Sequence, residues 1–149
     1  MVVTSVSPAS PVGQAVLERG GNAIDAAIAR ASGVVPFAEA ATLVGLAGSV
    51  TTVAALALDL PAYDAEAIHH SRIPVADVRA VSDALLVMSR AQRAALPVMH
   101  PGRVDVIGAG ALVLRRIMDV TGAAEVLVSE HDILDGLARS VAADPAPWS

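Results

Sequence analysis

A glycine-rich turn is the strongest chemical feature of this 149-residue sequence. Residues 44–52 read VGLAGSVTT, and Gly45 and Gly48 would let a ligand approach the backbone closely. The helix expected directly after the turn offers free N–H groups and a positive dipole end, which favour an anion such as phosphate. Ser49 and Thr51 would add hydroxyl contacts. The alternative is a tight turn in which Ser49 is an ordinary helix N-cap.

The turn lacks the Gly-Lys-Ser/Thr ending of a nucleotide-binding P-loop. A second glycine-rich segment, HPGRVD at 100–105 and IGAGA at 107–111, stands at another expected helix start. Its Arg103 would pair either with a phosphate or with Asp105. For the rest of that segment we favour a structural role, because Gly108 and Gly110 allow close helix packing.

The histidines do not form a recognisable catalytic or metal-binding pattern. His69 and His70 fall in a strand predicted at 68–73, where neighbouring side chains point to opposite faces and cannot readily share an ion. His131, four residues before Asp135, is expected at the surface. With no cysteine, no Ser-His-Asp order and no paired-carboxylate spacing, the sequence predicts no catalytic residue and no metal ligand in this chain.

Composition indicates one globular domain. Hydrophobic residues make up 54% of the chain, with a mean hydropathy of +0.60 and one each of Phe, Tyr and Trp, so the core must be aliphatic. A net charge of −5 and the scarcity of aromatic residues argue against nucleic acid as a partner. We expect an extended or disordered arm at 1–10, a single α/β domain at 11–143 and a tail at 144–149.

No membrane association is expected. Residues 40–58 are uncharged and close to spanning length, but small polar residues interrupt the stretch, which favours a strand, a turn and a buried helix. The N-terminus lacks the pattern of a signal peptide, and the absence of cysteine fits a reducing cytoplasm. We therefore predict a cytoplasmic protein.

Helices are expected between short strands, which favours a parallel or mixed sheet covered by helices. Hydrophobic spacing predicts a helix from Asn22 to Gly33 and another from Val50 to Asp59. Ser89 and Gln92 form a capping-box signature for a short helix. The remaining expected elements are strands at 42–46, 68–73 and 125–128 and helices at 78–88, 105–121 and 133–141.

Four segments in unbroken order resemble the exopolyphosphatase and guanosine pentaphosphate phosphatase family, most closely its actinobacterial members. They are LVGLAGSVTT (43–52), LPAYD (60–64), HPGRVDVI (100–107) and VSEHDILDG (128–136). The resemblance implies a helix-rich partial lobe of the actin/Hsp70-like, or ribonuclease H-like, phosphotransferase fold. It also implies hydrolysis of terminal phosphoanhydride bonds of polyphosphate, or of the 5′ phosphate of guanosine pentaphosphate, with Mg²⁺ or another divalent cation between two lobes.

In that family, two phosphate loops and a catalytic Glu precede the matched region, and this sequence contains none of them. The resemblance therefore implies a C-terminal lobe that is inactive alone and needs the missing N-terminal lobe, or a homodimer partner. Gly45, Gly48, Ser49, Thr51 and Arg103 would contribute phosphate contacts. The alternative is a non-catalytic phosphate-binding, nucleotide-binding or dimerisation module. Residues 15–27 are also similar to the start of γ-glutamyltransferases, whose nucleophilic Thr motif is missing downstream, so we interpret this similarity as local coincidence or a fused start.

Overall fold

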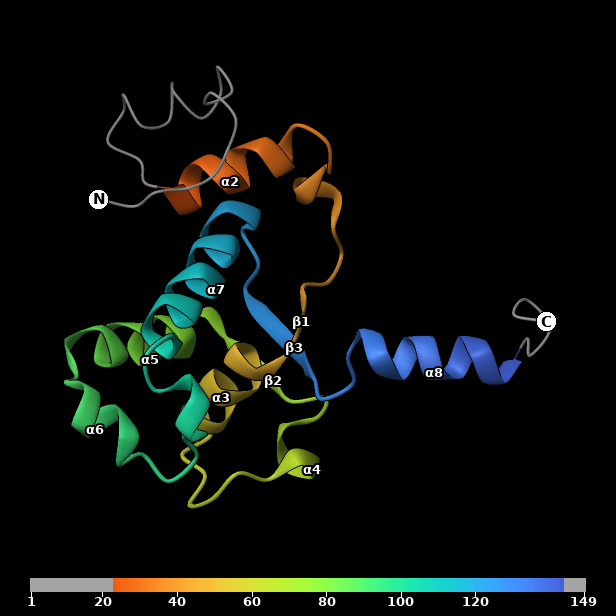
Figure 1. Cartoon of the computed structure of the whole chain (residues 1–149). Helices are drawn as coiled ribbons and strands as arrows, with labels where there is room; N and C mark the ends of the chain where they lie inside the picture. Colours follow the sequence, from red (N-terminus) through yellow and green to blue (C-terminus); the bar gives the residue numbers. More distant parts are fainter. Residues whose placement is uncertain (1–22, 144–149) are drawn as a thin grey trace.

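The structure is a computed structural model that describes residues 23–143 (Figure 1). The predicted arm at 1–10, the start of the predicted domain at 11–22 and the predicted tail at 144–149 lie outside the described residues. The elements in chain order are α2 (Ala23–Ser32), the 3-10 helix η1 (Phe37–Glu39), β1 (Val44–Leu46), α3 (Gly48–Ala57), α4 (Ala65–Ile68), β2 (Arg72–Pro74), α5 (Val75–Val87), α6 (Arg90–Ala94), the 3-10 helix η2 (Pro101–Arg103), α7 (Ile107–Thr121), β3 (Glu125–Ser129) and α8 (Ile133–Ala143).

The three strands form one mixed sheet in the order β1-β3-β2, as the alternation of helices and strands predicted. β1 and β3 run parallel, with Leu46 opposite Ser129. β2 runs antiparallel to β3, with Pro74 opposite Glu125. Proline is tolerated at that position because β2 is an edge strand. Since β1 and β3 are neighbours and parallel, their carboxyl ends lie at the same edge of the sheet.

Helices α3, α5 and α7 pack together against one face of the sheet (Figure 1). Val126 and Val128 are two residues apart in β3, so both side chains point toward this layer, and both are fully buried. Small residues such as Ala55 and Ala111, both fully buried, let the helices approach closely. The core is aliphatic throughout, which agrees with the scarcity of aromatic residues in the sequence.

The predicted strand at 68–73 is wrong over residues 68–71. The Asp64 side chain accepts hydrogen bonds from the N–H groups of Glu66 and Ala67, and this cap starts the short helix α4, which ends at Ile68. Backbone reversal at His70, where φ is 64°, delays the strand to Arg72. The predicted capping box at the start of α6 is confirmed. Helix α7 ends at Gly122, which adopts the left-handed conformation that glycine favours.

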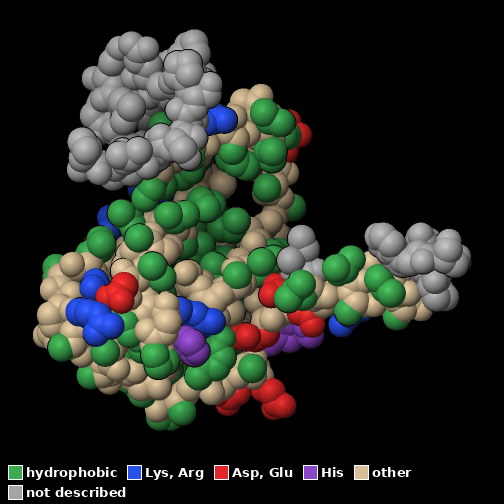
Figure 2. Space-filling view, viewed as in Figure 1, with side chains coloured by type: hydrophobic (Ala, Val, Ile, Leu, Met, Phe, Trp, Pro, Cys, Tyr) green, Lys and Arg blue, Asp and Glu red, His purple; other side chains and the backbone are tan. Residues whose placement is uncertain are grey.

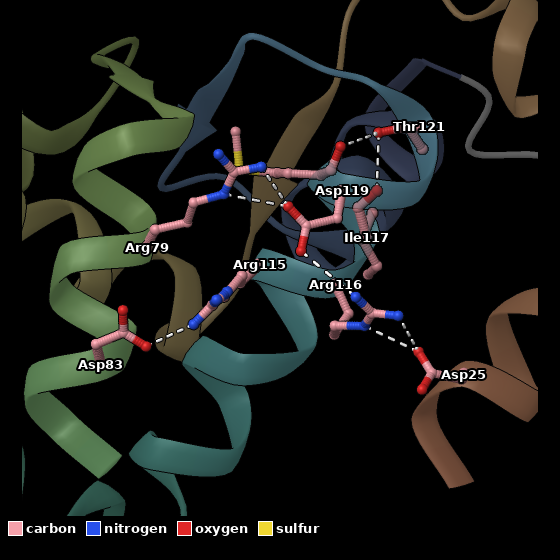
Figure 3. A network of polar contacts seen from close by, with 9 residues as sticks. Asp25, Arg79, Asp83, Arg115, Arg116, Ile117, Asp119 and Thr121 are labelled. Atoms are coloured by element: carbon pink, nitrogen blue, oxygen red, sulfur yellow. Dashed lines mark hydrogen bonds and ion pairs between the residues drawn. The ribbon is translucent and has the colours of Figure 1, made fainter. Parts of the chain in front are cut away.

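Ion pairs join the helices on the outside of this layer (Figure 3). The Arg116 Nη2 atom lies 2.6 Å from Asp25 Oδ1 and so ties α7 to α2, while Asp119 lies one turn further along α7 at 3.6 Å from the same guanidinium. Arg115 points the other way and lies 2.5 Å from Asp83 of α5. Arg115 and Arg116 therefore both form ion pairs that link α7 to a neighbouring helix.

Candidate functional site: the turn between β1 and α3

The glycine-rich turn lies at the carboxyl ends of the two parallel strands. β1 ends at Leu46, α3 begins at Gly48, and β3 ends beside them at Ser129. In open α/β sheets, ligands bind outside the carboxyl ends of parallel strands, because the helices that follow the strands direct their N-termini there. The fold thus places the turn where a ligand site is expected.

A strained backbone forms the turn. Ala47 has φ 69° and ψ 165°, a combination that residues with a β-carbon rarely adopt. Ala47, rather than Ser49, occupies the N-cap position of α3, and it supplies no side-chain cap. Within the described part of the chain, the N–H groups of Gly48 and Ser49 donate no hydrogen bond. The interpretation of Ser49 as an ordinary N-cap is therefore wrong, and two donors at the start of α3 are left available.

Gly48 lies directly against the guanidinium of Arg103. A β-carbon at position 48 would come well inside the 3.0 Å that real β-carbons keep from the guanidinium atoms. Arg103 Nη1 donates to Thr52 Oγ1 at 3.0 Å, and Thr52 Oγ1 in turn donates to the Gly48 carbonyl at 2.7 Å. The absence of a side chain at Gly48 thus lets Arg103 of η2 reach the first turn of α3, although the two residues are far apart in sequence.

Arg103 brings a positive charge to a helix end that is already positive. It has no carboxylate partner among residues 23–143: Asp105, the alternative partner considered from the sequence, lies 2.8 Å from Arg90 instead. A cation beside a helix N-terminus is unfavourable unless an anion accompanies it. The arrangement of free N–H groups with an unneutralised guanidinium therefore has the electrostatics of an anion-binding site.

Ser49 and Thr51 also face neighbours that limit their movement. A β-carbon at Gly110 of α7 would lie 2.5 Å from Ser49 Oγ, so the two helices meet closely at this point. Thr51 Oγ1 and the hydroxyl of Tyr63 are hydrogen-bonded at 2.8 Å. The same hydroxyl lies 2.7 Å from Glu130 Oε1, just beyond β3. Desolvation raises the pKa of Tyr63 above its usual value of 10.0, with Glu130 adding to the rise.

Sequence reasoning missed Tyr63 and Glu130. They are 67 residues apart, and no spacing rule joins a loop residue to the end of a distant strand.

Gly45 was predicted to contact phosphate, but its position differs from that of the other candidate residues. It is buried in β1, where a β-carbon would lie 2.7 Å from Val50 Cγ1 and 2.9 Å from Val126 Cγ2, so it faces the core. The structure brings Gly48, Ser49, Thr51 and Arg103 together, but it places Gly45 in the packing beneath them.

The histidines gather beside this edge of the sheet. His69 and His70 are not in a strand, and their rings stack with centroids 3.7 Å apart, contrary to the prediction of opposite faces. His131 meets His69 edge to face at 4.7 Å. His69 Nδ1 accepts a hydrogen bond from the Glu130 N–H, which joins the end of α4 to the end of β3. Desolvation is the main cause that lowers the pKa of His69.

Comparison with known proteins identifies the family. A family model, the Ppx/GppA phosphatase family, matches residues 4–142. The chain belongs to the Ppx/GppA phosphatase family. Its relatives include exopolyphosphatase 2 of Mycobacterium tuberculosis, 54% identical over 112 residues, which are 72% of this chain and 35% of the relative. A bifunctional 3-dehydroquinate synthase/phosphatase of Fusobacterium nucleatum is 30% identical over 95 residues, 64% of this chain and 14% of that protein.

Solved structures agree with the Ppx/GppA assignment. The crystal structure of an exopolyphosphatase-like protein matches with a TM-score of 0.75 and 34% identity, covering 86% of this chain and 41% of that one. A Ppx/GppA family member from Aquifex aeolicus matches with a TM-score of 0.65 and 23% identity over 70% of this chain and 35% of its own, which shows the shared fold. The fold is therefore the actin-like α/β fold predicted, and this chain spans little more than a third of these relatives. The family model also includes residues 15–27, which resembled γ-glutamyltransferases.

Among residues 23–143, no three His, Asp or Glu side chains are arranged to hold a metal ion. A hollow of about 420 Å³ lies at the opposite end of the sheet, lined by residues such as Phe37, Leu43 and Glu125, and it is separate from the turn. No helix in the described part of the chain is long and apolar enough to cross a membrane.

Proposed function

We propose that this chain is the C-terminal lobe of an exopolyphosphatase-type hydrolase and that its β1–α3 turn binds phosphate. The observation that carries the proposal is Arg103, a cation without a carboxylate partner in the described chain, which lies against Gly48 at the positive end of α3. A phosphate group would accept from Arg103 and from the N–H groups of Gly48 and Ser49.

The surrounding hydroxyls would orient the anion. Thr51 is hydrogen-bonded to Tyr63, and Tyr63 is hydrogen-bonded to Glu130, so the position of the Thr51 hydroxyl beside the turn is fixed. Positioning of this kind and electrostatic stabilisation supply most of the catalysis in phosphoryl transfer. Gly45 contributes indirectly, because its lack of a side chain lets α3 lie close to β1.

We propose that another lobe supplies the residues that activate water. Polyphosphate is the proposed substrate, by analogy with the exopolyphosphatase relative, and guanosine pentaphosphate is a second candidate. Mg²⁺ or another divalent cation would arrive with the phosphate chain and neutralise part of its charge, because the described residues hold no complete ligand set. The proposed location is the cytoplasm, where both phosphate compounds would be accessible.

Calorimetric titration of the full chain with polyphosphate and Mg²⁺ tests the phosphate site. We expect the native chain to bind polyphosphate and Arg103→Gln to bind at least about 10-fold more weakly, because one charge-assisted contact is lost. Arg30→Gln, an exposed arginine of α2, is the matched control and should bind as the native chain does. Binding that is absent in the native chain, or equal in the two variants, would overturn the site.

Phosphate release from polyphosphate tests the division into lobes. The chain alone should release no measurable phosphate, whereas robust Mg²⁺-dependent turnover by the chain alone would refute the need for a second lobe. A non-catalytic phosphate-binding or nucleotide-binding module is the second candidate, favoured by the lack of a metal-ligand cluster in residues 23–143. It predicts that binding persists while addition of the remaining part of a family member produces no activity.

A further inference from the structure

A cluster of three histidines lies at the same edge of the sheet as the β1–α3 turn. His69 and His70 follow α4, while His131 follows β3, and their rings meet by stacking and by edge-to-face contact. Histidine and acidic side chains form one exposed patch beside the start of α8 (Figure 2). The proposed contacts to phosphate involve none of these histidines.

A chain of hydrogen bonds joins His69 to the turn. His69 Nδ1 accepts from the backbone N–H of Glu130 at 3.2 Å, which fixes the residue that follows β3. The carboxylate of Glu130 lies 2.7 Å from the hydroxyl of Tyr63, and this hydroxyl lies 2.8 Å from Thr51 Oγ1. The chain of bonds therefore ends at a hydroxyl in the first turn of α3 that is proposed to orient phosphate.

The bond from Glu130 requires a neutral His69, because a protonated Nδ1 carries a hydrogen and cannot accept. Desolvation is the main cause that lowers the pKa of His69 below its usual value of 6.5. The neighbouring His70 and His131 lower this pKa further, and the Glu130 carboxylate acts in the opposite direction. His69 is therefore neutral at neutral pH and gains a proton only at a pH below 6.5.

Acidic side chains accompany the histidine cluster. Glu130 acts on His69, and Asp135 of α8 lies 3.6 Å from His131. Helix α3, which packs against α4, carries no acidic, basic or histidine side chain, and Arg72 of β2 is engaged in an ion pair. The carboxylates would offset much of the charge that a protonated His69 brings, and solvent screens the rest, so attraction of phosphate would change little.

We propose that neutral His69 is a positioning residue for the β1–α3 turn, acting through Glu130 and Tyr63, and that protonation of His69 weakens phosphate binding. The inference rests on the proposed function, because it takes this turn as the phosphate site. A protonated Nδ1 would face the Glu130 N–H donor to donor, so Glu130 must move and its carboxylate leaves Tyr63. The Thr51 hydroxyl then loses its fixed position.

Calorimetric titration of the full chain with polyphosphate at constant Mg²⁺, from about pH 8 to about pH 5.5, tests this coupling. The native chain should bind about 5-fold more weakly at the acidic end, because the hydrogen-bond chain is broken there. His69→Asn supplies an oxygen acceptor that does not titrate, so it should bind as the native chain does at the alkaline end and show no such loss. His69→Leu, which removes the acceptor, should bind about 5-fold more weakly at both ends.

Two controls separate His69 from its surroundings. The difference between the native chain and His69→Asn cancels the titration of polyphosphate itself. His70→Asn removes an imidazole from the same cluster and should keep the loss, with its midpoint at a higher pH, because His70 lowers the pKa of His69. Without any phosphate, the NMR signal of the Glu130 amide proton should move as the pH falls through the pKa of His69 in the native chain but not in His69→Asn.

Equal pH profiles for the native chain and His69→Asn would overturn the proposal, and so would native binding that becomes tighter than that of His69→Asn on acidification. A Glu130 amide signal that follows His69 while polyphosphate affinity stays constant would refute the link to the turn and leave the phosphate site intact. Absence of native binding at the alkaline end would refute the phosphate site, and this proposal with it.

Discussion

Replacing Gly48 by alanine separates the phosphate site from the stability of the fold. The new β-carbon would overlap the Arg103 guanidinium, which is the flexible end of its side chain and can swing away. That movement breaks the hydrogen bond from Arg103 to Thr52, a loss of about 1–2 kcal/mol. Alanine in the first turn of α3 recovers part of this, up to about 1 kcal/mol. The net loss of unfolding free energy is therefore about 1 kcal/mol.

Binding should respond more strongly than stability. With Arg103 displaced, the anion loses a charge-assisted contact, and we expect polyphosphate affinity to fall by about 10-fold or more. Thermal unfolding should shift by only about 2–5 °C. Calorimetric titration and a thermal melt of the full chain measure the two effects, and Gly136→Ala in α8 is the control, since a β-carbon there meets nothing within 4 Å.

The control should bind polyphosphate as the native chain does and melt at the same temperature or slightly higher. If Gly48→Ala retains native affinity while its melt shifts as expected, Arg103 does not contact the anion, and the proposed phosphate site is wrong. A Gly48→Ala chain with neither change would show that Arg103 does not lie on Gly48. Loss of folding in Gly48→Ala would contradict a net cost of only about 1 kcal/mol.

Three further predictions concern packing and charge. Gly45→Ala should lower the unfolding free energy by about 1–3 kcal/mol in a urea melt, because the added methyl overlaps Val50, and a native-like melt would contradict this. Tyr63 is the single tyrosine and its pKa is raised, so an absorbance titration should give a midpoint above 10.0 in the folded chain and a lower midpoint in urea. The stability that is linked to Tyr63 is present below the unfolded pKa and is lost as the pH rises through the folded pKa. Arg116→Gln should cost about 0.5–1 kcal/mol and increase hydrogen exchange in α2, because the pair with Asp25 is partly solvent-screened, and unchanged exchange in α2 would refute its role.

Most of the fold followed from local patterns in the sequence. Ser89 and Gln92 fixed the start of α6, and Gly122 fixed the end of α7, because caps satisfy backbone groups within a few residues. The strand at 68–73 was misplaced because the Asp64 cap and the reversal at His70 outweighed the apolar spacing. Local hydrogen bonds of this kind decide a boundary that hydrophobic periodicity leaves open.

The candidate site was only partly predictable. The residue types of the turn indicated an anion, but the sequence did not show that Arg103 would lie on Gly48 while Asp105 pairs with Arg90. The contact depends on how η2 packs beside α3, and several partners are within reach of a long arginine side chain. Gly45 shows the converse, because its turn-like sequence context concealed a role in the core.

By itself, the sequence determined an aliphatic α/β core, the position of the glycine-rich turn and the family resemblance, since these depend on composition, spacing and ordered motifs along the chain. Only the tertiary structure decided which distant side chains meet at the turn: Tyr63 with Glu130, and Arg103 with Thr52. Among residues 23–143, it also showed that β1 is an end strand of the sheet. Contacts between residues far apart in sequence arise from packing, which joins groups that no local rule relates.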